Sequence, residues 1–313
     1  MPTRRSLLAS LAALPLVPRF AFAQDPLAVV ATTGMIADTA RVLGGQGVSV
    51  RALMGPGVDP HAYRQTRSDI AAMVNADLTL WHGLYLEAQM EDFFADLAAR
   101  RSVVPVAEGL PRDLLLAHDQ YPDRVDPHVW MDPRLWASVS STLASALLTE
   151  RPDLGADAAL GPWSAELESL ALYAEEVLAT VPDASRVLVT AHDAFKYFGR
   201  AHGFEVQGIQ GISTESEAGV ARIEELVSLL VDRRVRAVFV ESSVSDRGLR
   251  ALVEGAAAQR HEVVIGGQLY SDAMGPDGTY EGTYLGMIDH NVTLIARALG
   301  GSAPEKGWKG LLS

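Results

Sequence analysis

The order of strand-like and helix-like segments constrains the fold of this chain more than any other feature. Short β-branched runs such as LAVVATT (27–33), VSVRALM (48–54) and SRVLVTAH (185–192) alternate with segments whose apolar residues recur every three or four positions, as in a helix. Because this alternation is typical of parallel sheets with helices on both faces, it predicts an α/β fold.

A long amphipathic segment near the middle of the chain interrupts the alternation. Apolar residues from Trp163 to Val181 recur at steps of three and four, with Pro162 before them and Pro182 after them. This pattern predicts one continuous helix of about five turns that begins at the first proline. Because no Gly/Ser-rich or Pro-rich linker accompanies this segment, we expect a stiff joint between two α/β blocks.

These features together predict two α/β lobes joined by one helix. We expect an N-terminal α/β lobe at 24–157, a linking helix at 158–183 and a C-terminal α/β lobe at 184–313. Two further helices are expected at 133–152, which has a proline at its start, and at about 284–299.

The first 23 residues are predicted to be an export signal, cleaved near Ala23 after AFA. The apolar stretch SLLASLAALPLV is too short for a stable membrane-spanning helix. The pair Arg4-Arg5 resembles a twin-arginine signal, although paired arginines also occur in ordinary signals. Because the chain has no cysteine for a lipid anchor, we expect a free protein in the periplasm.

The charge and the cysteine count exclude several classes of protein. Without the three arginines of the leader, 23 basic residues face 39 acidic ones, a net charge of −16. This balance argues against nucleic acid and anionic membrane as partners and suits a cationic ligand, although an ordinary acidic surface explains it as well. The absence of cysteine excludes disulfides, thiolate metal sites and thiol catalysis.

Four potential metal ligands lie in loops of the predicted fold. His61, His192 and Asp272 follow predicted strands, and His128 lies in a loop rich in proline and aspartate. In open α/β sheets, ligands bind in loops beyond the carboxyl ends of the strands. Neutral imidazoles and one carboxylate form a compact site for a divalent metal such as zinc.

The motif VDPH occurs twice, each time followed by one residue and then an aromatic residue. The proline restricts its own backbone and keeps the preceding Asp59 or Asp126 extended. These aspartates are expected to accept hydrogen bonds from nearby backbone N–H groups in their loops. Tyr63 and Trp130 are expected to wall the site and exclude water.

The remaining histidines are weaker candidates. His82 follows a predicted strand and could support the same cleft, while His118 lies in an acidic loop, where transient metal capture and simple solvation are both open. His202, His261 and His290 lie in or near helices and are expected at the surface or in packing. The four candidate ligands form no local metal signature, so from local pattern alone ordinary surface histidines remain an alternative.

Seven motifs along the chain, taken in order, resemble the cluster A-I metal-binding solute-binding proteins of bacterial zinc and manganese ABC importers. The resemblance covers essentially the whole chain after the leader. The motifs are GPGVDPHAYRQT, DPHVWMDP, TAHDAFKYFGR, GISTESE, VFVESSVS, GGQLYSDAMG and GTYLGMIDHNV.

The resemblance implies two Rossmann-like lobes spanned by a rigid helix, with one metal ion between them. The family's ligands fall on His61 in DPHAY, His128 in DPHVW, His192 in AHDAFKYF and Asp272 in YSDAMG. It further implies a monomeric binding protein rather than an enzyme, which delivers its ion to an ABC permease in the inner membrane. A periplasmic metallochaperone is a further candidate partner.

The metal is expected to be Zn²⁺, with Mn²⁺ as the alternative. Members that resemble dedicated manganese binders tend to have glutamate at the third ligand position, where this chain has His192. Imidazole favours zinc over manganese, and zinc also ranks higher in intrinsic affinity. Against zinc, the chain lacks the long His-rich loop of dedicated zinc binders, and YSDAMG resembles the manganese or mixed branch.

Two other functions remain as alternatives. An exported zinc-dependent hydrolase would need an open coordination position and a general base, for which Glu215, Glu217 and Glu241 are candidates. A siderophore- or vitamin-binding protein of similar architecture would need a wide apolar pocket. A Ser-His-Asp hydrolase is disfavoured because the sequence has no G-x-S-x-G motif.

Overall fold

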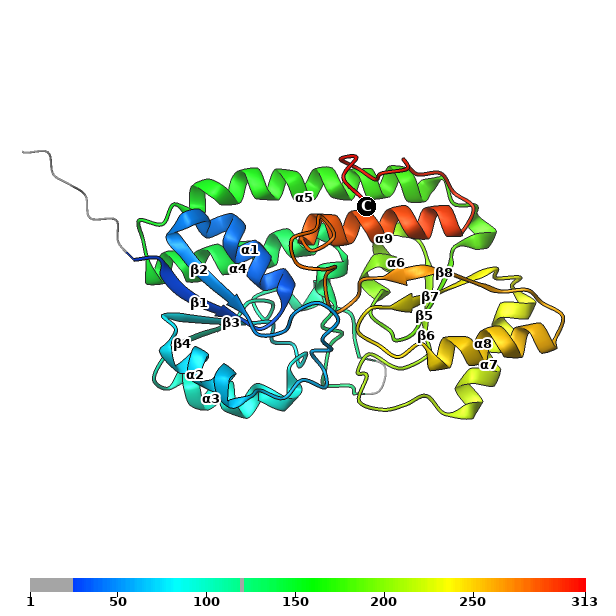
Figure 1. The fold of residues 1–313 in the computed structure, drawn as a ribbon, viewed down its shortest axis with the longest axis horizontal. Helices are drawn as coiled ribbons and strands as arrows, with labels where there is room; N and C mark the ends of the chain where they lie inside the picture. Colours follow the sequence, from blue (N-terminus) through cyan, green and yellow to red (C-terminus); the bar gives the residue numbers. More distant parts are fainter. Residues whose placement is uncertain (1–24, 119–120) are drawn as a thin grey trace, which may run out of the picture.

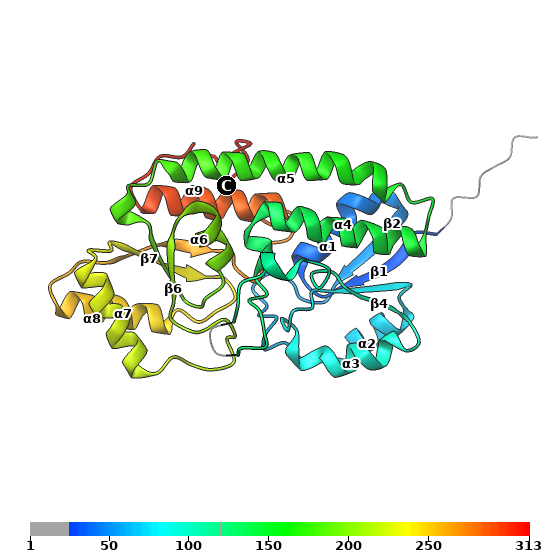
Figure 2. The same cartoon turned by 180° about the vertical axis from the view of Figure 1, so that it is seen from behind.

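The computed structural model describes residues 25–118 and 121–313, so the predicted leader lies outside the described residues. Two α/β lobes lie side by side beneath one long helix, α5 (Figures 1 and 2). This arrangement confirms the predicted architecture of two parallel-sheet lobes and a long helix. Over these two ranges, no helix combines the length and the apolarity needed to cross a membrane.

The N-terminal lobe contains a four-stranded parallel sheet in the order β2-β1-β3-β4. Helices α1, α2 and α4 start at residues whose side chains cap them. At α2, the Thr66 hydroxyl accepts from Asp69 N–H while the Asp69 side chain accepts from the Thr66 backbone. The elements are β1 (Leu27–Ala31), α1 (Gly34–Gly44), β2 (Val48–Ala52), α2 (Arg67–Asn75), β3 (Leu78–Trp81), α3 (Glu91–Ala98), β4 (Ser102–Pro105) and α4 (Pro133–Glu150).

The C-terminal lobe repeats the same strand order, β6-β5-β7-β8, with all strands parallel. In each sheet the strand order reverses between the two central strands, β1 and β3 in one lobe and β5 and β7 in the other. Such a reversal leaves a crevice at the carboxyl ends of the strands, where folds of this kind bind ligands. The elements are β5 (Val187–Thr190), α6 (Lys196–His202), β6 (Glu205–Gly208), α7 (Val220–Asp232), β7 (Ala237–Glu241), α8 (Arg247–Ala258), β8 (Val264–Leu269) and α9 (Tyr284–Ala298).

The long helix α5 (Ala156–Ala179) begins earlier than the sequence pattern predicts. The prediction of a start at Pro162 is wrong, because this proline lies inside the helix and the helix begins after Gly155, which has φ of 76°. Gly161 and Pro162 are exposed, so the carbonyl that loses its hydrogen-bond partner to the proline can be solvated. The exact division into 24–157, 158–183 and 184–313 stays a prediction.

Aromatic side chains from both halves of the chain pack together beneath α5. Trp136 of α4 stacks on Tyr284 of α9 with ring centroids 5.4 Å apart, and Trp163 of α5 meets the same tyrosine edge-on at 6.2 Å. All three belong to a hydrophobic core that runs from β1 and α1 to β5, β7 and α9. Because this core is continuous across the helix, it stiffens the joint between the lobes.

Buried hydrogen bonds also link the lobes. Trp130 Nε1 donates to the Ser271 carbonyl at 2.8 Å, and the Tyr284 hydroxyl donates to the Trp130 carbonyl at 2.8 Å. The Tyr197 hydroxyl donates to the Asp126 carbonyl at 2.7 Å. These bonds tie the loops around His128 and Asp272 to opposite lobes, so the two loops are held in fixed relation.

The close packing of α9 against the loop before it predicts a large cost for a Gly286→Ala substitution. A Cβ at this position would lie 1.8 Å from the Tyr280 carbonyl oxygen, and backbone cannot move aside as a flexible side chain can. We expect the free energy of unfolding to fall by about 3 kcal/mol in a denaturant titration. Gly55→Ala is the control, because nothing lies within 4 Å of its added Cβ and a change within about 1 kcal/mol is expected. Equal stabilities for the two variants would contradict this reading of the packing.

Candidate metal site

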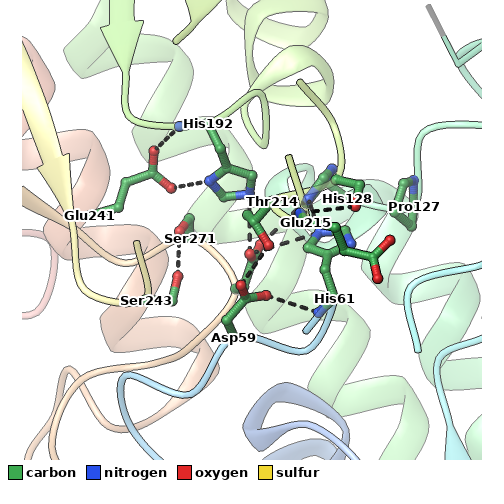
Figure 3. A network of polar contacts seen from close by, with 12 residues as sticks. Asp59, His61, Pro127, His128, His192, Thr214, Glu215, Glu241, Ser243 and Ser271 are labelled. Carbon is green, nitrogen blue, oxygen red and sulfur yellow. Dashed lines mark hydrogen bonds and ion pairs between the residues drawn. The ribbon is translucent and has the colours of Figure 1, made fainter. Parts of the chain in front are cut away.

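Each candidate ligand lies in a loop between the two lobes, and both lobes contribute. His61 lies in the loop after β2, and His128 immediately precedes the short helix that leads into α4. His192 comes two residues after β5, and Asp272 comes three residues after β8. The structure thus brings together four residues that are up to 211 positions apart in the sequence. Figure 3 shows the three histidines of this set.

The donor atoms of these four residues converge on one point, all within 4.8 Å of one another. Asp272 carboxylate oxygens lie 3.1 Å from His192 Nε2, 3.4 Å from His128 Nε2 and 3.9 Å from His61 Nε2. The Nε2 atoms of His61 and His128 are 3.2 Å apart. A tetrahedral zinc site with bonds of ~2.0–2.1 Å has edges of about 3.3–3.4 Å between ligands. The observed spacings therefore suit one small ion.

The candidate ligands are buried, and some of their polar atoms make no hydrogen bond to any described residue although they lie close to one another. The exposed fraction is 0% for His128 and His192, 3% for Asp272 and 4% for His61. Among the described residues, both carboxylate oxygens of Asp272 and Nε2 of His192 are buried without a hydrogen bond. Since buried polar atoms in folded proteins are nearly always satisfied, a cation bound between them would suit these atoms.

The aspartates of the two VDPH motifs hold the loops as predicted. Oδ1 of Asp59 accepts from His61 N–H at 2.9 Å, and Oδ1 of Asp126 accepts from His128 N–H at 2.9 Å. Asp126 Oδ1 also lies 2.7 Å from His128 Nδ1, which leaves Nε2 of that ring facing the other ligands. The other oxygen of Asp59 accepts instead from the Thr214 hydroxyl of the C-terminal lobe, at 2.5 Å.

Glu241, the last residue of β7, makes the equivalent contacts to His192 (Figure 3). Its Oε1 accepts from His192 N–H at 2.8 Å, and its Oε2 lies 2.5 Å from His192 Nδ1. The second contact is a close ion pair rather than a well-aligned hydrogen bond. From the sequence alone, Glu241 was expected only as a candidate base. Its position as an acidic residue at the end of the predicted strand VFVE was the available signal for this role.

The carboxylates divide the histidines into two electrostatic groups. Burial alone would lower the pKa of His128, but Asp126 and Asp272 outweigh it and raise the pKa to about 9. Burial is likewise outweighed at His192, where Asp272 and Glu241 raise the pKa well above its ordinary value. Burial dominates at His61 and lowers its pKa to about 3. Burial alone would raise the pKa of the Asp272 carboxyl, but His192 and His128 outweigh it and hold this pKa well below the ordinary value.

One of the two predicted aromatic walls is in place. Trp130 packs edge-on against His128 with centroids 5.1 Å apart. The prediction for Tyr63 is wrong: its hydroxyl donates to Asp69 at 2.7 Å, and its ring packs against the separate hydrophobic cluster around α2 and α3. The strong acceptor at the start of α2 draws this side chain away from the site.

The remaining histidines lie outside the donor cluster. His82 is fully buried, and its Nε2 lies 2.8 Å from the Pro127 carbonyl, so it supports the loop of His128 as a neighbour of the ligands. His261 and His290 contact backbone carbonyls, of Val235 and Gln268 respectively. His202 packs against the ring of Phe198 with centroids 4.9 Å apart, and the prediction that these last three histidines lie at the surface or in packing is confirmed.

Two cavities flank the donor cluster. One, of about 620 Å³, is lined by His61, His118, Glu215 and Glu217 among others, and a second, of about 660 Å³, is lined by Asp272. Glu215 is engaged across the lobes, because its carboxylate accepts from the side-chain amide of Gln89 at 2.6 Å. The three candidate bases Glu215, Glu217 and Glu241 thus each accept a hydrogen bond, from Gln89, Gln210 and His192 respectively.

Comparison with known proteins places this chain in a family. Residues 29–298 match the model of the family described as zinc-uptake complex component A, periplasmic. The chain is 44% identical over 280 residues to the manganese-binding lipoprotein MntA of Bacillus subtilis, covering 88% of this chain and 91% of the relative. It is 42% identical over 273 residues to the zinc-binding protein TroA of Treponema pallidum, covering 87% and 88%.

Solved structures agree with this placement. The periplasmic zinc-binding protein TroA from Treponema pallidum superposes with a TM-score of 0.85 at 42% identity, covering 88% of this chain and 99% of that one. The Fe(III)-bound YtgA from Chlamydia trachomatis gives a TM-score of 0.79 at 26% identity, covering 89% and 100%. The chain belongs to the family of periplasmic zinc-uptake component A proteins, which are metal-binding components of ABC importers rather than enzymes.

Proposed function

We propose that this protein captures one divalent metal ion, Zn²⁺ in preference to Mn²⁺, through His61, His128, His192 and Asp272, and delivers it to an ABC permease. The observation that carries this proposal is the set of four buried donor atoms within 4.8 Å of one another. The orphaned oxygens of Asp272 support it, since an ion would give them a partner.

The donor set favours zinc. Three imidazole nitrogens and one carboxylate match the ligand preferences of zinc, whereas manganese prefers oxygen donors and water. The spacings between donor atoms fit a tetrahedron with zinc-length bonds. With four protein ligands in place, no position remains open for a catalytic water, which agrees with a binding role.

Manganese is a second candidate because Asp272 offers more than one oxygen. Oδ1 of Asp272 lies toward His128 and Oδ2 toward His192, and neither oxygen is engaged elsewhere among the described residues. A carboxylate that binds through both oxygens would raise the coordination number above four and bring the site closer to the needs of manganese. The relatives are likewise named for both metals, MntA for manganese and TroA for zinc.

The cellular setting follows from the family, and its details remain proposals. We expect the ion to be bound in the periplasm by a monomer and passed to a permease of the inner membrane. A metallochaperone remains a candidate donor of the metal. Several relatives are named lipoproteins, while this chain has no cysteine, so a free and unanchored form stays a prediction.

A titration of metal-free protein with each ion tests the proposal. We expect saturation at one ion per chain, with a dissociation constant for zinc at least about 10-fold below that for manganese, in line with the order of intrinsic affinities. Metal analysis of protein purified from its own periplasm then reports which ion it carries in the cell. Absence of stoichiometric binding by either ion would refute the function. Tighter binding of manganese would overturn the preference for zinc alone.

A further inference from the structure

We propose that Glu241 is a positioning residue that presents His192 to the metal ion, as Asp126 does for His128. This inference rests on the proposed function, because it assigns a role within the same site. It concerns a residue that does not itself face the ion: Glu241 acts through the backbone and the ring of His192.

The geometry of Glu241 commits both of its oxygens to one histidine. Oε1 accepts from the backbone N–H of His192 at 2.8 Å, and Oε2 lies 2.5 Å from Nδ1 of the same ring. Nε2 on the opposite edge of the ring is 3.1 Å from Asp272 Oδ2. Because one carboxylate contacts both the backbone and the ring of His192, it sets the orientation of the ring. Its contact with Nδ1 favours a proton on that nitrogen, which leaves Nε2 as the donor to a metal.

A related arrangement occurs in the other lobe, built from different chain segments and from one carboxylate oxygen. Asp126 Oδ1 accepts from His128 N–H at 2.9 Å and lies 2.7 Å from His128 Nδ1. Asp126 is two residues from its histidine, whereas Glu241 is 49 residues from His192 and reaches it because β5 and β7 are neighbours in the sheet. Two carboxylates from unrelated positions in the chain thus contact the Nδ1 side of two candidate ligands. This repetition indicates that the site requires oriented imidazoles.

His61 provides the contrast within the same site. Asp59 accepts from the His61 backbone at 2.9 Å, but its second oxygen accepts from Thr214. No described carboxylate is paired with Nδ1 of His61, and this ring also lines the cavity of about 620 Å³. The two carboxylate-held histidines are the fully enclosed ones, with exposed fractions of 0%. Glu241 therefore holds one of the two candidate ligands that are closed off from solvent.

Burial leaves His192 as the main contact of the Glu241 carboxylate. The exposed fraction of Glu241 is 3%, so bulk water has little access to its oxygens. A carboxylate on the far nitrogen of a ligating imidazole increases the basicity of that ligand, and loss of such a partner typically weakens metal binding by about 10–100-fold. The expected effect is thus smaller than loss of a ligand but well above that of a remote surface change.

The experiment compares Glu241→Ala and Glu241→Gln with the unaltered protein, using zinc and cobalt(II) as the probes. We expect Glu241→Ala to weaken zinc binding by about 10–100-fold and to alter the visible absorption of the cobalt(II) form, because the orientation of one ligand changes. Glu241→Gln offers one acceptor oxygen and one N–H donor group to the two nitrogens of His192, so it should lose part of the affinity, less than Glu241→Ala does. Asp126→Ala should show a loss comparable to that of Glu241→Ala.

Asp289→Asn is the matched control for a merely structural role. Asp289 is a fully buried acidic residue of the same lobe that accepts from Trp308 N–H at 2.9 Å and contacts no candidate ligand. We expect it to lower the melting temperature of the metal-free protein while leaving zinc affinity and the cobalt spectrum unchanged.

The outcomes separate this inference from the function on which it rests. If the unaltered protein binds neither zinc nor cobalt, the proposed function fails. If it binds both while Glu241→Ala has the same affinity and spectrum, the role of Glu241 is overturned. It is equally overturned if Asp289→Asn weakens binding as much as Glu241→Ala. Should Glu241→Ala not fold, Glu241→Gln decides, and an unchanged affinity and spectrum in that variant overturn the role of Glu241. If Asp126→Ala is also unchanged, carboxylate positioning is refuted for both histidines.

Discussion

Replacement of Asp272 by asparagine is expected to weaken zinc binding by more than about 100-fold, beyond the range for residues that only support a ligand. Asp272 is the one acidic residue among the four candidate ligands, and its oxygens lie 3.1–3.9 Å from all three imidazoles. Asparagine preserves the shape but removes the charge that offsets the cation and one of the two carboxylate oxygens. Competition against a chromophoric zinc chelator, starting from metal-free protein, measures the change.

Asp277→Asn is the control for this substitution. Asp277 lies five residues further along the same loop, is exposed and is not part of the donor cluster. We expect it to bind zinc as the unaltered protein does. A loss of less than 10-fold in Asp272→Asn, or an equal loss in both variants, would show that this carboxylate is not a ligand.

Zinc affinity is expected to rise with pH by about 100-fold per unit between pH 5 and pH 8, because an entering ion must displace two protons. Carboxylates raise the pKa of His128 to about 9 and that of His192 well above its ordinary value, so both rings are protonated in the metal-free protein at neutral pH. His61, with a pKa of about 3, is already neutral, and Asp272 is already ionised. Below the two raised pKa values, each unit of pH therefore changes the binding constant by two powers of ten.

Zinc titrations at pH 5.5, 6.5 and 7.5, corrected for chelator protonation, test this dependence. Calorimetry in buffers of different ionisation enthalpy counts the released protons directly, and about two per zinc ion are expected at pH 7. The slope should fall in Asp272→Asn, because Asp272 contributes to the raised pKa of both histidines. An affinity that does not change over this range would contradict the assignment of protons to His128 and His192.

Local features of the site followed from neighbouring residues and could be predicted. In each VDPH motif the aspartate accepts from the N–H two residues ahead, a contact set by short-range backbone geometry alone. The placement of His61, His192 and Asp272 also followed from their positions near predicted strand ends, because parallel strands direct their carboxyl ends to one edge of a sheet.

Features that depend on distant neighbours could not be predicted. The pairing of Glu241 with His192 requires β5 and β7 to lie side by side, and no local pattern states which strands are neighbours. Tyr63 looked equivalent to Trp130 in the sequence, yet Asp69 draws its hydroxyl to the start of α2. The early start of α5 was missed because Pro162 resembles a helix beginning, whereas its exposure in the fold lets the helix continue through it.

By itself, the sequence determined the α/β class, the long central helix and the four residues with the right chemistry for a metal, since periodicity and residue type are local properties. The tertiary structure alone decided that these four donor atoms lie within 4.8 Å of one another and that two carboxylates contact two of the histidines. It also decided that, among the described residues, neither oxygen of Asp272 makes a hydrogen bond. The physical reason is that the candidate metal site is a convergence of side chains from two lobes, and convergence depends on strand order and on packing across the central helix.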